Sequence, residues 1–166
     1  MEIKSTISWR GKNYDLVYRD IDSIDELENR KVSAVHAWCF YGDKIVIVYA
    51  KNKDIWTPPG GGVEDGENCI DAMIREVREE TNMKVLKWRF VGYQDVYEPN
   101  NISTQVRFVC TVEPYGDFVK DPDEGDITEI KLIDAKDFNR EYFNWGEIGD
   151  HITKRALEMK TGMLND

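Results

Sequence analysis

Cysteine and histidine are scarce in this chain. The three cysteines, Cys39, Cys69 and Cys110, are odd in number and include no CxxC pair, which argues against a disulfide framework and a thiolate zinc site. The two histidines, His36 and His151, form no HExxH pattern, so a histidine zinc site is not expected either. Reduced cysteines are typical of cytosolic proteins, and we therefore expect a cytoplasmic location.

Long apolar runs and an excess of positive charge are also missing. No segment is apolar for long enough to predict a signal peptide or a bilayer-spanning helix. The 22 basic and 32 acidic side chains give a formal net charge of −10, which repels nucleic acid polymers and anionic membranes. We expect neither as a partner. An acidic enzyme that acts on phosphates would need divalent cations to mask its own field.

What is present is the patterning of a globular protein. The chain has 166 residues, of which 41% are hydrophobic and 33% charged, enough for one sizeable core. Alternating and β-branched segments predict strands, and apolar residues at helical spacing predict helices. Strands are expected at 3–9, 14–18, 32–40, 44–49, 85–97, 102–114 and 127–133, one helix at 68–81, and a C-terminal amphipathic helix through Ile148, Ile152, Leu157 and Met159.

Shorter segments carry signals of their own. Residues 23–26 and 144–147 both have capping-box spacing, which predicts a short helical turn and the start of the C-terminal helix. Residues 56–62 contain two prolines and three glycines, so we expect an irregular segment there. The glycine- and acid-rich residues 116–126 are expected to form a loop.

The order of the elements predicts one domain over residues 1–166. Residues 1–30 would form an N-terminal hairpin extension and residues 32–160 the core. Strands, a central helix, more strands and a terminal helix favour an α+β or layered α/β/α sandwich around a mixed sheet. The hairpin is expected either to mediate a dimer or to cover a sheet edge, and both a monomer and a homodimer are left open.

The helix at 68–81 carries three carboxylates on one face. Glu76, Glu79 and Glu80 are three and four residues apart, which places them together. Like charges at these spacings cost roughly 0.2–0.5 kcal/mol per pair, so a merely solvated helix gains nothing from them. Mg²⁺ and Mn²⁺ favour carboxylate oxygen. The pattern therefore indicates a divalent-cation site, with an ordinary exposed acidic helix as the alternative.

The spacing around this helix resembles the Nudix box of the Nudix hydrolase (MutT-like) family. That box has a glycine, five residues, a glutamate, seven residues, and then Arg-Glu, a bulky aliphatic, any residue, Glu-Glu, any residue, glycine and a bulky aliphatic. Gly61, Glu67 and Arg75 occupy these offsets, followed by Glu76 to Met83. Only Asn82 departs, where the family has glycine. Asn is the usual second choice in the left-handed conformation that ends such helices, so the departure spares the chemistry.

The resemblance implies a Mg²⁺-dependent hydrolase, with Mn²⁺ as a substitute, that cleaves the pyrophosphate linkage of a nucleoside diphosphate joined to another moiety. It implies metal binding by Glu76, Glu79, Glu80 and Gly60, and catalytic roles for Glu76 and Glu79, with the identity of the base left open. Arg75 would orient the carboxylates by bidentate pairing, and Glu67 would be accessory. Gly61 and Gly62 would let backbone approach the substrate.

Two positions outside the box are weaker candidates. A downstream carboxylate often completes such a site, and Glu129 is our first choice, ahead of Glu124; both are equally consistent with solvated acids. Pro99 lies where ADP-ribose-type members have a substrate-loop proline, but residues 98–101 are rich in turn formers and favour a plain turn. An ADP-sugar is therefore kept as one alternative substrate and is not predicted as the main one.

The substrate is not fixed by the box, because fold and motif give the reaction class alone. ADP-ribose or another ADP-sugar and an oxidised nucleoside triphosphate are the specific alternatives. The non-enzymatic alternative is a nucleotide sensor that has lost catalysis. Such a protein is expected to have lost one of the three glutamates, whereas this chain keeps all three together with Arg75. Trp56 and Trp145 border predicted loops, where they are placed to stack on a base, although packing roles are commoner for such residues.

Overall fold

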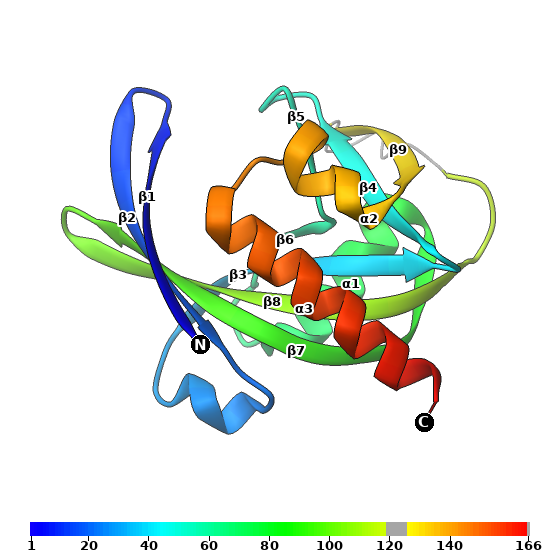
Figure 1. The fold of residues 1–166 in the computed structure, drawn as a ribbon, viewed down its shortest axis with the longest axis horizontal. Coiled ribbons are helices and arrows are strands. Elements are labelled where there is room, and N and C mark those ends of the chain that lie inside the picture. Colours follow the sequence, from blue (N-terminus) through cyan, green and yellow to red (C-terminus); the bar gives the residue numbers. More distant parts are fainter. Residues whose placement is uncertain (119–125, 166) are drawn as a thin grey trace.

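The computed structural model describes residues 1–118 and 126–165. In this part of the chain nine strands form one mixed sheet with the main order β1-β2-β7-β8-β3-β4-β5 (Figure 1), while β6 pairs with β3 and β9 with β4. β3 and β8 run parallel, and the other strand pairs are antiparallel. The strands are β1 (Glu2–Trp9), β2 (Lys12–Asp20), β3 (Val32–Tyr41), β4 (Lys44–Ala50), β5 (Ile55–Thr57), β6 (Gly60–Gly62), β7 (Met83–Glu98), β8 (Asn101–Pro114) and β9 (Ile127–Ile133).

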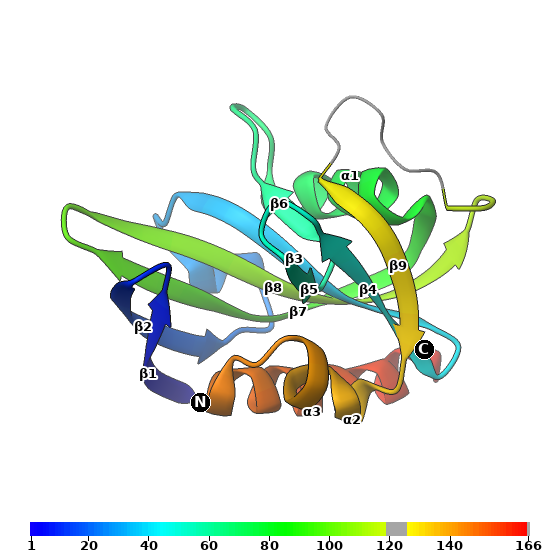
Figure 2. The same ribbon diagram turned by 90° about the horizontal axis from the view of Figure 1, so that it is seen from above.

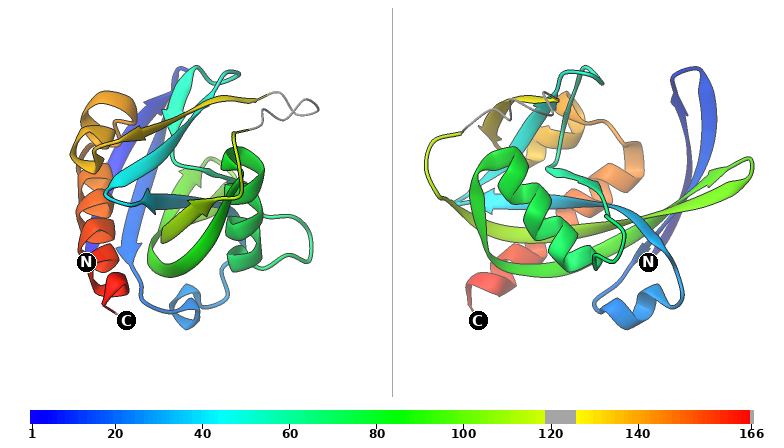
Figure 3. Two further views of the ribbon diagram at one scale, coloured as in Figure 1. Left: turned by 90° about the vertical axis from the view of Figure 1, so that its right-hand side faces the viewer. Right: turned by 180° about the vertical axis from the view of Figure 1, so that it is seen from behind.

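Two longer helices cover opposite faces of the sheet. Figures 2 and 3 show α1 on one side and α3 on the other. Met73 and Val77 of α1 are buried in a cluster with Phe108, and Ile148 and Ile152 of α3 are buried in a second cluster across the sheet. The layered α/β/α sandwich with a mixed sheet is thus confirmed. The helices are η1 (Ile24–Leu27), α1 (Cys69–Thr81), α2 (Ala135–Asp137), η2 (Phe138–Tyr142) and α3 (Gly146–Leu164).

The ends of α1 follow directly from two asparagines. Asn68 is the N-cap, and its side-chain oxygen accepts a hydrogen bond from the Asp71 N–H at 2.8 Å. Asn82 ends the helix in the left-handed conformation, with φ 53° and ψ 38°. Asparagine tolerates this conformation better than most residues. The chain therefore turns straight into β7, and the helix is fixed at both ends in the predicted register.

Three sequence predictions were wrong in detail. Residues 56–57 and 60–62 are not irregular but belong to β5 and β6; β6 pairs with β3, and Gly60 lies so close to the Val35 carbonyl that any side chain would overlap it. The capping box at 144–147 does not form, since Trp145 is the N-cap of α3 without a side-chain hydrogen bond. Leu157, expected on the buried stripe, is exposed, and Ala156 is buried instead.

Other predictions at the local level hold. The capping box at 23–26 forms, with the Ser23 side chain accepting from the Asp25 N–H at 3.2 Å and Glu26 accepting from the Ser23 N–H at 3.0 Å.

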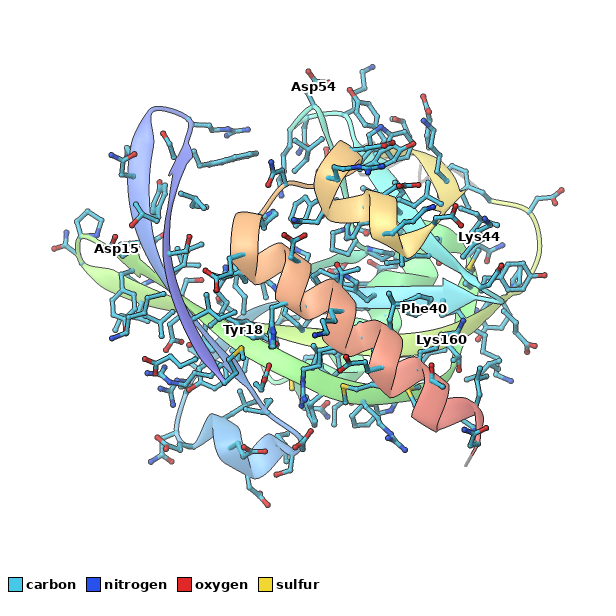
Figure 4. All side chains as sticks on the ribbon, in the orientation of Figure 1. Asp15, Tyr18, Phe40, Lys44, Asp54 and Lys160 are labelled. Carbon is cyan, nitrogen blue, oxygen red and sulfur yellow. The ribbon has the colours of Figure 1, made fainter. Side chains whose placement is uncertain are left out.

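On α3, Lys160 lies over the Phe40 ring, with Nζ 5.0 Å from the ring centroid (Figure 4). This contact fixes the last turns of α3 against β3. The described helices include none whose length and apolar character would let it cross a membrane.

The N-terminal hairpin continues the sheet instead of standing apart from it. β2 pairs with β7 from Asp15 opposite Tyr97 to Asp20 opposite Gly92. The hairpin therefore covers the β7 edge, one of its two expected roles, while a role in dimers stays a prediction. β1 also contacts α3.

Candidate active site

Arg75 is the centre of the acidic face of α1. Its Nε and Nη2 donate to the two carboxylate oxygens of Glu67, each at 2.9 Å. Its Nη1 donates to Glu76 Oε1 at 3.0 Å and to Glu79 Oε2 at 3.2 Å. A further bond runs from Nη2 to the Gly62 carbonyl oxygen at 3.0 Å. One guanidinium therefore ties three glutamates to the loop that precedes the helix.

The Arg75–Glu67 pair is locked in its charged form. The hydrogen bond from Arg75 is the main cause that holds the pKa of Glu67 below its ordinary value. The hydrogen bond to Glu67 likewise raises the pKa of Arg75. Such a bidentate pair adds geometric specificity to its charge. Neither group changes charge near neutral pH, so the pair acts as a fixed support for Glu76 and Glu79.

Glu80 has the opposite electrostatic setting. Burial raises its pKa to about 8, and the negative charges of Glu76 and Glu79 push in the same direction. A hydrogen bond from the Gly60 N–H to Glu80 Oε2 at 3.0 Å and the charge of Lys53 oppose this rise. The site thus contains a carboxylate that is held partly protonated at neutral pH by its surroundings.

Gly60 is required by close packing against backbone, and Gly61 lies directly against the Glu76 carboxylate. A Cβ at Gly61 would lie 2.5 Å from Glu76 Oε1. A Cβ at Gly60 would overlap the Val35 carbonyl and crowd His36. The glycines therefore bring the β6 backbone against the carboxylates of α1, where a backbone carbonyl can join them as a donor.

This donor set fits a hard divalent cation. Carboxylate and carbonyl oxygens are the ligands such ions prefer, and a bound cation would relieve the repulsion that Glu76 and Glu79 impose on Glu80. Among the described residues, however, no three acidic, histidine or cysteine side chains already converge on one ion position. Glu76 and Glu79 instead accept hydrogen bonds from Arg75. Binding of a cation therefore requires these two side chains to rotate.

The carboxylates face a cavity of about 700 Å³ that extends well beyond α1. Its walls include β6 with α1, the β4–β5 connection, the tip of the N-terminal hairpin and the segment before α3, together with parts of β3, β7, β8 and the start of β9. A volume of this size accommodates a small-molecule ligand. Among its lining residues are Gly60, Gly61, Gly62, Glu76, Glu79, Glu80, Lys53, His36, Gln105, Trp9, Tyr14, Tyr142, Phe143 and Trp145.

The weaker candidates fall outside this cavity. Glu129 is exposed on β9, where it pairs with Tyr49, and it does not line the cavity. Glu124 lies outside the described residues. Pro99 lies in the turn between β7 and β8 and lines a separate hollow with Lys12 and Tyr14. The structure thus leaves Glu129 and Pro99 without a contact to the acidic face of α1.

Sequence reasoning missed several residues that do line the cavity. Asp126, three residues before Glu129, is an acidic residue that lines the cavity. Trp9 and Tyr14 come from the N-terminal hairpin, and only the β2–β7 pairing brings them there.

Trp145 lines the cavity, whereas Trp56 packs on Tyr142 with ring centroids 6.1 Å apart. The signal for Trp145 was its position at a predicted loop.

The fold and the site define an α/β/α sandwich with a glutamate-bearing helix facing a ligand-sized cavity. The model of the NUDIX domain matches residues 30–154, which is more than half of the chain. The chain therefore belongs to the NUDIX domain family, as its box predicted.

Individual relatives agree with this assignment. The chain is 28% identical over 100 residues to the Nudix hydrolase YvcI of Bacillus subtilis (strain 168), covering 55% of this chain and 63% of YvcI. It is 27% identical over 95 residues to Nudix hydrolase 6 of Arabidopsis thaliana, covering 57% of this chain and 33% of that protein. The chain thus spans less than two thirds of either relative.

A solved structure shows the same fold. The pyrophosphohydrolase BsRppH of Bacillus subtilis superimposes with a TM-score of 0.70 at 18% sequence identity, covering 87% of this chain and 92% of that one. At this level of identity the likeness establishes the fold alone.

Proposed function

We propose that this protein is a Mg²⁺-dependent hydrolase that cleaves the pyrophosphate linkage of a nucleoside diphosphate joined to another moiety. The observation that carries the proposal is the cluster of Glu76, Glu79 and Glu80, supported by Arg75, on the wall of a ligand-sized cavity. Membership of the NUDIX family supports the same reaction class. Mn²⁺ is expected to replace Mg²⁺, because both favour carboxylate oxygen.

The residues divide into holding and positioning groups. Glu76, Glu79, Glu80 and the Gly60 carbonyl would hold the cation, and Gly61 and Gly62 would bring backbone close to the substrate. When bound, the cation supplies charge neutralisation on the diphosphate and lowers the pKa of the attacking water. Glu76 or Glu79 would take the proton from that water. Arg75 is a positioning residue because it holds Glu76 and Glu79, and Glu67 is one because it holds Arg75.

The acidic cavity wall makes metal binding a condition for substrate binding. A diphosphate carries several negative charges, and the described part of the wall contains five acidic residues and one lysine: Glu76, Glu79, Glu80, Glu98, Asp126 and Lys53. Unscreened, these carboxylates repel the substrate. Activity should therefore require a divalent cation at concentrations that also fill the carboxylate cluster.

The substrate is proposed only at the level of a nucleotide diphosphate compound. The placement of Pro99 outside the cavity gives no support to ADP-ribose or ADP-sugars in particular. An oxidised nucleoside triphosphate stays an alternative, and a nucleotide sensor without catalysis is the non-enzymatic one. The cytoplasmic location and the absence of nucleic acid and membrane partners stay predictions from the sequence.

Release of a nucleoside monophosphate from a panel of nucleotide diphosphate compounds with Mg²⁺ or Mn²⁺ tests the proposal. We expect release from at least one compound with the metal and none with a chelator. If the folded protein releases nothing from any compound but binds nucleotides, the sensor alternative replaces the enzyme.

A further inference from the structure

Arg107 is a buried arginine without an acidic partner. It lies on β8 with 3% of its surface exposed. Its Nη1 lies 2.7 Å from His36 Nδ1, and its Nη2 donates to Gln105 Oε1 at 2.8 Å. No described carboxylate forms an ion pair with it, and burial lowers its pKa to about 10. A charge buried in this way is costly unless it has a function or a partner.

Arg107 fixes the hydrogen-bonding polarity of its two neighbours. A guanidinium has five N–H donors and no acceptor, so His36 Nδ1 and Gln105 Oε1 must both accept. His36 is then neutral and carries its proton on Nε2, in keeping with burial and Arg107 lowering its pKa well below the ordinary value. The bond from Arg107 holds Gln105 Oε1 toward another side chain of β8 itself, which leaves the amide N–H groups of Gln105 for other partners. Because both residues line the cavity, they present N–H donors to it.

Gln94 is an independent indication that a polar group of a ligand belongs beside His36 and Gln105, which form the floor of the cavity. Its side chain is fully buried, and neither its amide oxygen nor its nitrogen has a hydrogen-bond partner in the described part of the chain. It stands opposite Gln105 on β8 and Tyr18 on β2 (Tyr18 is labelled in Figure 4). Val96, two residues on, lines the cavity, so Gln94 points to the same face. A buried amide left unpaired is costly.

We propose that His36 and Gln105, held by Arg107, form a donor-only subsite on the cavity floor that takes an acceptor oxygen of the ligand. The acceptor is a keto oxygen of a nucleobase or an oxygen of a phosphate. An exocyclic amino group is disfavoured there, because it would meet N–H donors with its own N–H groups. The inference rests on the proposed function only in taking this cavity as the nucleotide site.

Equilibrium binding of nucleoside monophosphates, measured by calorimetry, tests the subsite. These compounds contain no phosphoanhydride bond, so their binding is measured whether or not the protein is a hydrolase. UMP and CMP differ by a keto oxygen against an amino group, and GMP and AMP differ in the same way at position 6, although GMP also carries a 2-amino group. Inorganic pyrophosphate is the probe for a phosphate in the subsite.

Three variants complete the experiment. Gln105→Glu keeps size and gives Arg107 a carboxylate, but it replaces the donor by an acceptor. Gln105→Met keeps the approximate volume and removes both the hydrogen-bond donor and the acceptor. Asn29→Asp adds the same charge at an exposed position outside the cavity and should bind like the wild type. Thermal melts confirm that each variant is folded.

A keto oxygen in the subsite predicts that the wild type binds UMP about tenfold more tightly than CMP, and GMP more tightly than AMP, in line with the cost of unpaired polar groups. Gln105→Met then weakens the preference, because the His36 N–H is the only donor left, and Gln105→Glu weakens it further or reverses it. A phosphate in the subsite predicts instead that Gln105→Glu weakens pyrophosphate and all four nucleotides about equally, by tenfold or more. The proposal is overturned if folded Gln105→Glu and Gln105→Met bind every probe as the wild type does, or if the wild type prefers CMP and AMP.

Discussion

The acidic face of α1 and the floor of the cavity are two polar regions of one site, and they balance charge in opposite ways. On α1, Arg75 satisfies three glutamates at once, and the excess negative charge faces the cavity. On the floor, the positive charge of Arg107 is buried with only His36 and Gln105 as partners. An excess of negative charge attracts a cation, whereas a surface of donors attracts an anion or a keto oxygen. The two regions together suit a metal-bound nucleotide.

The first prediction tests the acidic face of α1. Glu79→Gln keeps size and helix propensity but removes a proposed metal ligand, so kcat should fall at least about a hundredfold. Circular dichroism and a thermal melt should show an intact fold, because Glu79 is partly exposed. Glu158→Gln on α3, an exposed glutamate outside the cavity, is the matched control. Near-full activity of Glu79→Gln would show that the metal assignment is wrong.

The second prediction separates charge from geometry at Arg75. Lysine keeps the positive charge but cannot make the bidentate contact with Glu67 while reaching Glu76 and Glu79. Arg75→Lys should lower kcat/KM by about 10–100-fold, as loss of an outer-shell partner does, and more Mg²⁺ should be needed for half-maximal rate. Arg78→Lys, in the same helix but over the Tyr115 ring, should change little. Equal activity of the two variants would remove the positioning role of Arg75.

The third prediction tests the wall that the N-terminal hairpin supplies. Stacking of a base on an aromatic ring is worth about 1–3 kcal/mol. If Trp9 stacks on the nucleotide, Trp9→Ala should raise KM about tenfold and leave kcat nearly unchanged. Tyr41→Ala removes an exposed aromatic ring from the β3–β4 hairpin, outside the cavity, and should leave both constants unchanged. A fall in kcat with an unchanged KM would contradict a binding role for the hairpin.

The difference between the two regions also explains what the sequence alone could predict. Gly61, Glu67, Arg75 and Glu79 lie within one turn and one helix, where residue spacing determines which side chains meet. The conformation of Asn82 was predictable for the same reason, because it depends on local backbone preference. Local geometry of this kind needs no knowledge of the sheet.

The cavity floor depends on strand register, which spacing does not give. His36 meets Arg107 only because β3 and β8 pair in parallel with those two residues opposite each other. The strand β6 was missed because two prolines and three glycines suggested a loop, while its pairing depends on close approach to Val35. Trp9 reaches the cavity only through the β2–β7 pairing. These contacts join segments far apart in the chain, so no local pattern marks them.

The smallest predicted effect concerns the proton held at Glu80. Its folded-state pKa is raised to about 8 by burial and by Glu76 and Glu79, so the folded protein binds this proton more tightly than the unfolded chain does. The stability that this proton contributes is present in full below the ordinary carboxyl pKa and is lost as the pH rises through about 8. In chelator, the thermal midpoint of the wild type should therefore fall relative to that of Glu80→Gln between pH 5 and pH 9.

The expected difference is at least about 3 °C, which corresponds to roughly 1 kcal/mol for a chain of this length. Glu158→Gln is the control for loss of a glutamate, since that side chain is exposed, and its midpoint should follow the wild type at every pH. Saturating Mg²⁺ should flatten the wild-type curve, because a cation replaces the proton as the partner of Glu80. Parallel curves for the wild type and Glu80→Gln in chelator would show that the repulsion among the three glutamates is screened by water, and that a cation is not needed to relieve it.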